Sequence, residues 1–318
     1  MANDGAGRSV LKWGCFGCLG CFGLLVALLL VAVGLGWLGA RTAELEDAVL
    51  SRDLPSIDQS APAQADGPAP PPGAPLVPGT LGPTAGRVVL DLAQAEFHLL
   101  PGEPGGQVRV EARYDKNAYE LEETLERPPG DAWTYRVQFR RTRGGWVSGL
   151  RSLFGGISPK VTVRLPPDVP LDLDMNIRQG GAEIELGGLS LNSAKITVAQ
   201  AGGAIAVSEP LRAPMRSFDL TARMGGMSVR SLGNASPAEV RVDCSMGGME
   251  LDLRGEWVQD AAIDLKTSMG GIQVHLPRDL PIRGVAGRGL REDVEPEVRL
   301  PTLTFSVDDD SSGEVEFD

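Results

Sequence analysis

Residues 218–230 read FDLTARMGGMSVR, and two similar units follow: EVRVDCSMGGMELD at 239–252 and AAIDLKTSMGGIQVH at 261–275. Each unit has a run of alternating apolar residues, a pair of small residues and a second alternating run. The same pattern reaches back to Leu171, so that residues 171–276 hold five units. Repetition at a period of about 20 to 50 residues is typical of solenoids and arrays. The repeat therefore predicts a β-solenoid in which each unit forms one turn of the coil.

The small pair of each unit fixes how the units align. In four units it is a glycine pair, at 180–181, 225–226, 247–248 and 270–271. In the remaining unit, alignment on Gly202-Gly203 breaks the apolar alternation, whereas alignment on Ala201-Gly202 restores it. Strand side chains alternate between the two faces, so a slip of one residue would turn the whole apolar set to solvent. We therefore expect Ala201-Gly202 to be the aligned pair.

This alignment places a charged residue on the outer face of every unit, six positions before the pair. These residues are Asp174, Lys195, Asp219, Arg241 and Asp264. Their charges alternate in sign from one unit to the next. Parallel strands stacked in register, about 4.8 Å apart, would place each charge beside opposite ones. The column thus predicts the stacking order.

The glycines and the methionines beside them each have two interpretations. Small pairs suit a bulge or tight bend at the same corner of every turn, which we favour over a ligand-binding loop. The methionines of Met224-Gly-Gly-Met227 and Met246-Gly-Gly-Met249, with Met269, suit an inward ladder that fills the core. The alternative is a soft-metal site for copper(I) formed by these methionines with Cys244 nearby.

The N-terminal region predicts a membrane anchor and a linker. Residues 1–12 form a short polar tail, and residues 13–40 carry no charge and exceed the roughly 20 residues of a transmembrane helix. Positive residues before this span favour an N-terminus inside a bacterial cytoplasmic membrane, with the rest outside. Residues 41–85 predict a short helix followed by an extended linker rich in Pro, Ala and Gly. Within the span, Cys15, Cys18 and Cys21 are interpreted as packing residues, with thiol modification or metal binding as alternatives.

Residues 86–318 are predicted to form one β-solenoid domain, with its regular repeats at about 168–280. One segment, 136–164, contains seven basic residues and no acidic residue. Inside it, apolar residues fall at helical spacing between Trp146 and Phe154, with candidate strands at 134–140 and 160–165 on either side. The amphipathic helix would either cap the open end of the solenoid, which we favour, or form a patch for a membrane or partner. The candidate patch residues are Arg140, Arg141, Arg143, Trp146, Leu150, Arg151 and Phe154.

No catalytic, cofactor-binding or metal-binding residues are predicted. His98 and His275, the two histidines, lie far apart in sequence on outward strand positions and are interpreted as surface residues. Residues 303–317 predict two strands around the turn 308–313, interpreted as a hairpin, with a calcium loop as the alternative. The net charge of −12 argues against a nucleic-acid surface. The sequence thus predicts a protein that is not an enzyme.

The units Met224-Gly-Gly-Met-Ser-Val, Met246-Gly-Gly-Met-Glu-Leu and Met269-Gly-Gly-Ile-Gln-Val resemble those of a known family, as does Val161-Thr-Val-Arg-Leu-Pro-Pro. They resemble the bacterial "putative adhesin" or toast-rack β-solenoid domains, which are similar to the exterior domain of cell-wall-active antibiotics response proteins. The resemblance implies a fold, and no functional residue. It implies tethering to a membrane and a role in adhesion or envelope-stress signalling. Since solenoids present extended surfaces, we expect a membrane-anchored scaffold that contacts an envelope protein or polysaccharide. The alternative is an envelope-stress sensor or regulator acting through membrane partners.

Overall fold

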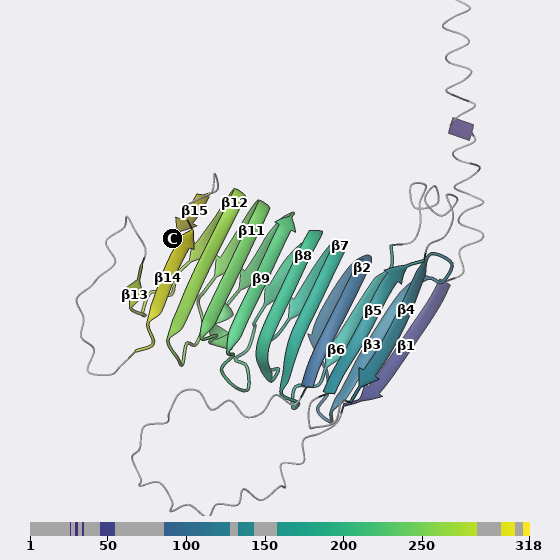
Figure 1. The fold of residues 1–318 in the computed structure, drawn as a ribbon, viewed down its shortest axis with the longest axis horizontal. Coiled ribbons are helices and arrows are strands. Elements are labelled where there is room, and N and C mark those ends of the chain that lie inside the picture. The colour runs from purple at the N-terminus through teal and green to yellow at the C-terminus, as the bar shows by residue number, and fades with distance from the viewer. Residues whose placement is uncertain are drawn as a thin grey trace, which may run out of the picture.

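The computed structural model describes residues 45–54, 86–127, 133–142, 158–284, 300–308 and 314–318, together with Val26, Leu29, Leu30 and Gly34. The described chain is almost entirely β-structure, in one sheet of order β1-β3-β6-β2-β7-β8-β10-β11-β12-β14-β13 (Figure 1). The strands are β1 (Leu45–Asp53), β2 (Gly86–Pro101), β3 (Gln107–Asp115), β4 (Tyr119–Glu126), β5 (Trp133–Arg141), β6 (Lys160–Leu165), β7 (Leu171–Glu185), β8 (Leu191–Ala206), β9 (Ser217–Met224), β10 (Met227–Arg230), β11 (Glu239–Asp252), β12 (Ala261–His275), β13 (Ile282–Arg283), β14 (Leu303–Asp308) and β15 (Glu314–Phe317). A short 3-10 helix, η1 (Leu232–Ala235), follows β10.

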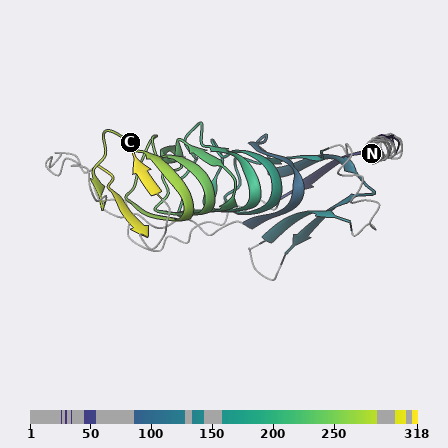
Figure 2. The same cartoon turned by 90° about the horizontal axis from the view of Figure 1, so that it is seen from above.

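In β2, β7, β8, β11 and β12, one long strand curls back on itself, whereas two other turns consist of two shorter strands each, β9 with β10 and β14 with β15. β7 has 15 residues, enough to span about 50 Å if it were straight. Only residues 186–190 separate it from β8, and they cannot span that distance. The strand must therefore bend, and the curl is visible in Figure 2. Its inward side chains fill the space inside the coil and form the core.

The register predicted from the small pairs is confirmed. In the parallel pairing of β7 with β8, Gly180 lies beside Ala201 and Asp174 beside Lys195. The next steps pair Lys195 with Asp219, Asp219 with Arg241 and Arg241 with Asp264. All five charges of the predicted column thus lie in one row across the sheet.

Only some of the neighbouring side chains in this row form ion pairs with each other. Arg241 reaches Asp219 at 3.2 Å, whereas Asp174 pairs with Arg87 of β2 at 2.6 Å. These side chains are largely exposed, so each pair contributes at most about 1 kcal/mol to stability. The column marks the register, and the buried inward face drives the folding.

The predicted fold class, a parallel solenoid preceded by a transmembrane helix, is wrong in two respects. The first concerns the N-terminal end, which is antiparallel. β5 and β6 pair in parallel with the two halves of β2, but β4 pairs antiparallel with β5 and β3 antiparallel with β6. β1 then adds antiparallel to β3. The sheet thus continues in two antiparallel extensions, one made of β6, β3 and β1 and the other of β5 and β4. The two extensions separate from each other at this end of the molecule (Figure 2).

The second respect concerns the helices predicted before the solenoid. Among the described residues, no helix is long and apolar enough to cross a membrane. Of the predicted span only Val26, Leu29, Leu30 and Gly34 are described, and the tail 1–12 and residues 55–85 of the linker lie outside the described residues. The short helix predicted at the start of the linker is replaced by β1. The edge of β3 supplies its hydrogen-bond partners, and Leu50 packs against the core.

Side chains close the space between the two antiparallel extensions. Phe139 stacks on Tyr119 at a centroid distance of 5.1 Å and meets Tyr114 edge-on at 5.5 Å. Beside them, Glu123 of β4 forms an ion pair with Arg52 of β1 and accepts a 2.9 Å hydrogen bond from the Tyr135 hydroxyl. Burial, followed by the bond to Glu123, raises the pKa of Tyr135 and keeps its hydroxyl protonated.

The C-terminal strands form the last turn of the coil, so the predicted hairpin is wrong. β14 and β15 do not pair with each other. Both pair in parallel with β12, β14 along its first half and β15 along its second half. Residues 309–313, between them, lie outside the described residues.

Candidate functional site

The first glycine of each pair is required by the geometry of the corner. Gly180, Gly225 and Gly247 have φ values of 123°, 123° and 124°, which L side chains rarely adopt. A Cβ at Gly225 or Gly247 would lie 2.1 Å or 2.0 Å from a carbonyl oxygen of the preceding turn. A Cβ at Gly270 would likewise lie 2.0 Å from the Gly247 oxygen. For these residues the corner interpretation is confirmed.

In four turns, neither the backbone conformation nor the available space requires glycine as the second residue of the pair. Gly181, Gly226, Gly248 and Gly271 lack the positive φ, and a Cβ at Gly181 or Gly248 would meet nothing within 4 Å. At Gly226 and Gly271 the nearest atoms would be 3.9 Å and 3.6 Å away, which is ordinary contact. These four glycines therefore leave backbone bare where a side chain would fit.

Glutamates at the two ends of the same row show that a side chain is accepted there. Glu96 of β2 pairs with Gly181, and Glu314 of β15 pairs with Gly271. Between them the row is glycine in every turn: Gly181, Gly202, Gly226, Gly248 and Gly271. We name this row of bare backbone the corner trough. Only Gly202 is sterically tight, since its Cβ would lie 3.2 Å from the Gly226 oxygen.

A groove of about 540 Å³ lies over the C-terminal part of the corner trough. It runs from Gly203 on β8 to Glu316 on β15, across the intervening turns, and the buried Met227, Met249 and Ile272 lie beneath it. One wall consists of the outward residues two positions after the trough, which are Ser228, Glu250, Gln273 and Glu316. With Glu314, the lining has three carboxylates, and no lysine or arginine is among the residues that line it.

Two positions before the trough, the opposite side carries exposed methionines. Met224, Met246 and Met269 lie beside one another on successive turns and are 36%, 39% and 59% exposed. The predicted inward ladder is therefore wrong for these three residues. It is right for Met227 and Met249, which are 4% exposed. The glycine bend turns the residue before it outward, although the alternation would place it inside.

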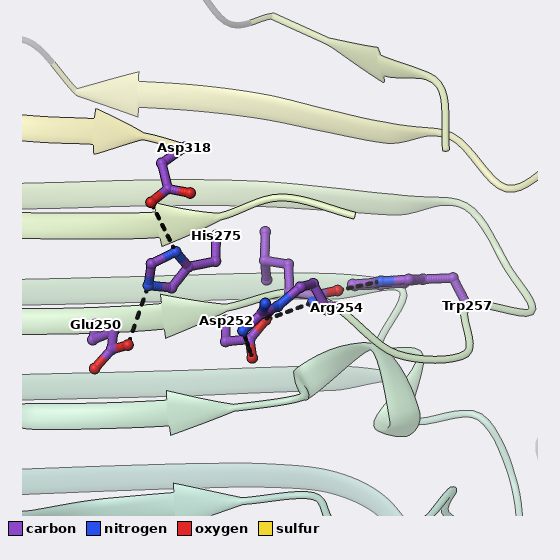
Figure 3. A network of polar contacts seen from close by, with 7 residues as sticks. Glu250, Asp252, Arg254, Trp257, His275 and Asp318 are labelled. Carbon is purple, nitrogen blue, oxygen red and sulfur yellow. Dashed lines mark hydrogen bonds and ion pairs between the residues drawn. The ribbon is translucent and has the colours of Figure 1, made fainter. Parts of the chain in front are cut away.

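His275 lies beside the groove, between two carboxylates. Its Nε2 lies 3.1 Å from Glu250 Oε1 and its Nδ1 lies 3.3 Å from Asp318 Oδ2 (Figure 3). Partial burial lowers the pKa of His275, but the hydrogen bonds with Asp318 and Glu250 outweigh it and raise the pKa above 6.5. The imidazole ring on β12 therefore bridges Glu250 of β11 and Asp318, the residue that follows β15. His98 lies similarly at the other end of the trough, between Glu96 and Glu183.

The turn after β11 is fixed by a carboxylate and an indole. Arg254 donates to Asp252 from Nε at 2.7 Å and from its terminal nitrogen at 2.9 Å. Trp257 Nε1 donates to the Leu253 oxygen at 2.7 Å (Figure 3). Burial raises the pKa of Asp252, but the bonds from Arg254 outweigh it and hold the pKa below its usual value. These contacts fix the turn that follows β11.

Nothing in this arrangement points to catalysis. The carboxylates of the groove are exposed, and within the described ranges no three His, Cys, Asp or Glu side chains are grouped to hold a metal ion. Cys244 is buried, and burial raises the pKa of its thiol, so it is a poor nucleophile. The chemistry available in the groove is charge attraction and contact with bare backbone.

Only Arg140 and Arg141 of the patch predicted from the sequence are described, and neither lines this groove. Arg140 and Arg141 end β5, in the N-terminal part of the sheet, and Arg140 forms an ion pair with Glu122. Arg143, Trp146, Leu150, Arg151 and Phe154 lie outside the described residues, so the patch stays a prediction. Sequence reasoning missed the corner trough because a glycine that bends a strand and one that leaves its backbone bare look alike in a sequence.

Comparison with known proteins gives weak likenesses. No family model and no curated protein matches the chain. A solved structure from Clostridium sporogenes, described as a "putative cell adhesion protein", has 9% identity, covers 86% of this chain and 99% of its own, and gives a TM-score of 0.36. A "putative adhesin" from Parabacteroides distasonis has 10% identity, covers 87% and 98%, and gives a TM-score of 0.26. Both descriptions name adhesion, as does the family that the repeats resemble, and neither names an antibiotics response protein. The TM-scores are too low for either likeness to carry an argument.

Proposed function

We propose that this protein is a non-enzymatic interaction scaffold whose corner trough holds an extended, basic segment of a partner polypeptide. The observation that supports this best is the row of glycines from Gly181 to Gly271. Four of its five members are required neither by φ nor by space, and glutamates occupy the same row at its ends. Glycine at such positions suits the close approach of another backbone.

The shape of the groove supports an extended partner. Successive turns are about 4.8 Å apart, so the four steps from β8 to β15 span roughly 19 Å. That length corresponds to about six residues of extended polypeptide. The floor follows the coil axis and is shallow, which suits a chain lying along it.

The charges support a basic partner. Glu250, Glu314 and Glu316 line the groove, and the whole chain has a net charge of −12. Such a surface attracts basic segments and repels anionic polymers. A polypeptide is favoured over a polysaccharide because no aromatic side chain is among the lining residues to stack on a sugar ring.

The experiment measures binding of a ten-residue peptide of alternating Lys and Ser to the full chain by fluorescence anisotropy. We expect binding that weakens as salt is added, because the attraction is between exposed charges. A peptide of alternating Glu and Ser should not bind. Retention of the chain on isolated cell-wall polysaccharide, without binding of the Lys-Ser peptide, would overturn the proposal.

Two matched pairs of variants separate the trough from general charge attraction. Gly248→Leu fills the trough beneath the groove, whereas Gly181→Leu places the same side chain in the same row outside the groove lining, and neither has an atom within 4 Å of its Cβ. Glu316→Gln removes a charge from the groove, whereas Glu120→Gln removes one from β4. Only the first member of each pair should weaken binding. Equal effects within the pairs would mean that the peptide binds elsewhere.

The location at the cell envelope and the alternative role in envelope-stress signalling stay predictions from the sequence. The scaffold proposal depends on neither of them, because the trough is present in the isolated chain.

A further inference from the structure

The exposed methionines form a column that the peptide proposal does not use. Met224 pairs with Met246, and Met246 pairs with Met269, on three successive turns. We name these three residues the thioether column. They are absent from the lining of the groove, which begins on the other side of the glycines.

The placement of these residues is unlike that of the other methionines. In the part of the chain that the structure describes, Met175, Met215, Met227 and Met249 are all buried. Every methionine that is exposed there belongs to the thioether column. The same position is glutamine in the two preceding turns, Gln179 and Gln200, whereas three successive turns carry methionine there.

The column is open to solvent on its trough side. Each of its residues is followed by two glycines, so no side chain from those positions covers the sulfur atoms. Adjacent turns lie about 4.8 Å apart, and the unbranched methionine side chain has enough rotatable bonds for three sulfur atoms to converge. Three thioether donors can therefore meet at one point above Met246.

Three thioethers are a donor set for a soft cation. Thioether sulfur prefers copper(I) to harder ions such as zinc, magnesium or calcium, which prefer nitrogen, thiolate or oxygen. We propose that the thioether column binds one copper(I) ion through Met224, Met246 and Met269. The buried Cys244 thiol lies 3.9 Å from the Gly247 oxygen and takes no part, because burial raises its pKa and disfavours the thiolate.

The experiment titrates the full chain with copper(I) kept reduced by ascorbate, in competition with a chromogenic copper(I) chelator. Cys15, Cys18 and Cys21 are first replaced by serine, because these thiols would also bind the ion. We expect one copper(I) ion per chain. Silver(I), a soft ion stable in air, should bind with the same stoichiometry.

Matched leucine variants assign the site. The triple variant Met224→Leu, Met246→Leu, Met269→Leu should lose the binding, since leucine keeps the size of methionine without its sulfur. The double variant Met227→Leu, Met249→Leu changes the buried methionines of the same units and should keep it. Circular dichroism checks that each variant is folded. No binding at micromolar copper(I), or binding that survives in the folded triple variant, would overturn the proposal.

Discussion

Two neighbouring glycines should respond in opposite ways to the same substitution. In Gly247→Ala the new Cβ would lie 2.0 Å from the Gly225 oxygen, at a φ of 124°. In Gly248→Ala the new Cβ would meet nothing within 4 Å, at a φ outside the positive region. The two variants have the same composition, so a difference between them reports the corner geometry alone.

The magnitudes follow from these two environments. A residue held in a sparsely populated backbone conformation costs about 1–3 kcal/mol, and forcing packed atoms apart costs about 1–3 kcal/mol more. We therefore expect Gly247→Ala to lower the free energy of unfolding by about 2–6 kcal/mol. Gly248→Ala should leave it unchanged or raise it by about 0.4–1 kcal/mol, because alanine restricts the unfolded chain.

Urea unfolding followed by circular dichroism measures the difference. The midpoint should fall for Gly247→Ala, and the slope should stay close to that of the parent chain. Gly225→Ala, with a φ of 123° and a contact of 2.1 Å to the Ala201 oxygen, should repeat the result of Gly247→Ala. Equal loss of stability at residues 247 and 248 would refute the distinction between the two glycines, and with it the corner trough.

Three further predictions concern the rest of the described chain. The raised pKa of His275 adds stability that is fully present below pH 6.5, its unfolded value, and is lost as pH rises through the folded pKa. His275→Gln should therefore flatten the pH dependence of urea unfolding above pH 6.5, and an unchanged profile would contradict the contacts with Glu250 and Asp318. Phe139→Ala should cost about 3–5 kcal/mol in the same assay, because the buried ring packs against three other aromatic rings; a loss below 1 kcal/mol would argue against that packing. Cys244 should resist iodoacetamide at pH 8 until the chain is unfolded, as peptide mass mapping can show, and rapid native labelling would contradict its burial.

The sequence contained enough information to place the turns of the coil in register. The alternation of apolar residues allowed one alignment of the small pairs, and the charges from Asp174 to Asp264 then fell into one row, as the structure confirms. This worked because each strand must bury one face, which leaves little freedom of register.

The rule of alternation failed where the strand stops being straight. Met246 has inward parity, but the next residue, Gly247, has a φ of 124°, and the bend directs the Met246 side chain outward. An added Cβ at Gly247 would meet the Gly225 oxygen of the neighbouring turn. That contact joins residues more than 20 positions apart and cannot be read from a single unit.

Long-range pairing also decided the ends of the molecule. Residues 45–53 are locally compatible with a helix, and they become β1 because β3 offers an unpaired edge. The sequence of residues 303–317 suggests a hairpin, but its described parts, β14 and β15, become two halves of one turn because β12 offers parallel partners to both. In both cases the deciding partner is distant in sequence and outweighs local preference.

Because the strands of each turn pair with those of the turns on either side, a further unit could be added without changing the strand pairing inside the others (Figure 1). A copy of one unit inserted between β11 and β12 would extend the trough by about 4.8 Å and leave its width unchanged. The number of repeats therefore sets the length of the trough, whereas the outward side chains that successive turns contribute set the charge along it.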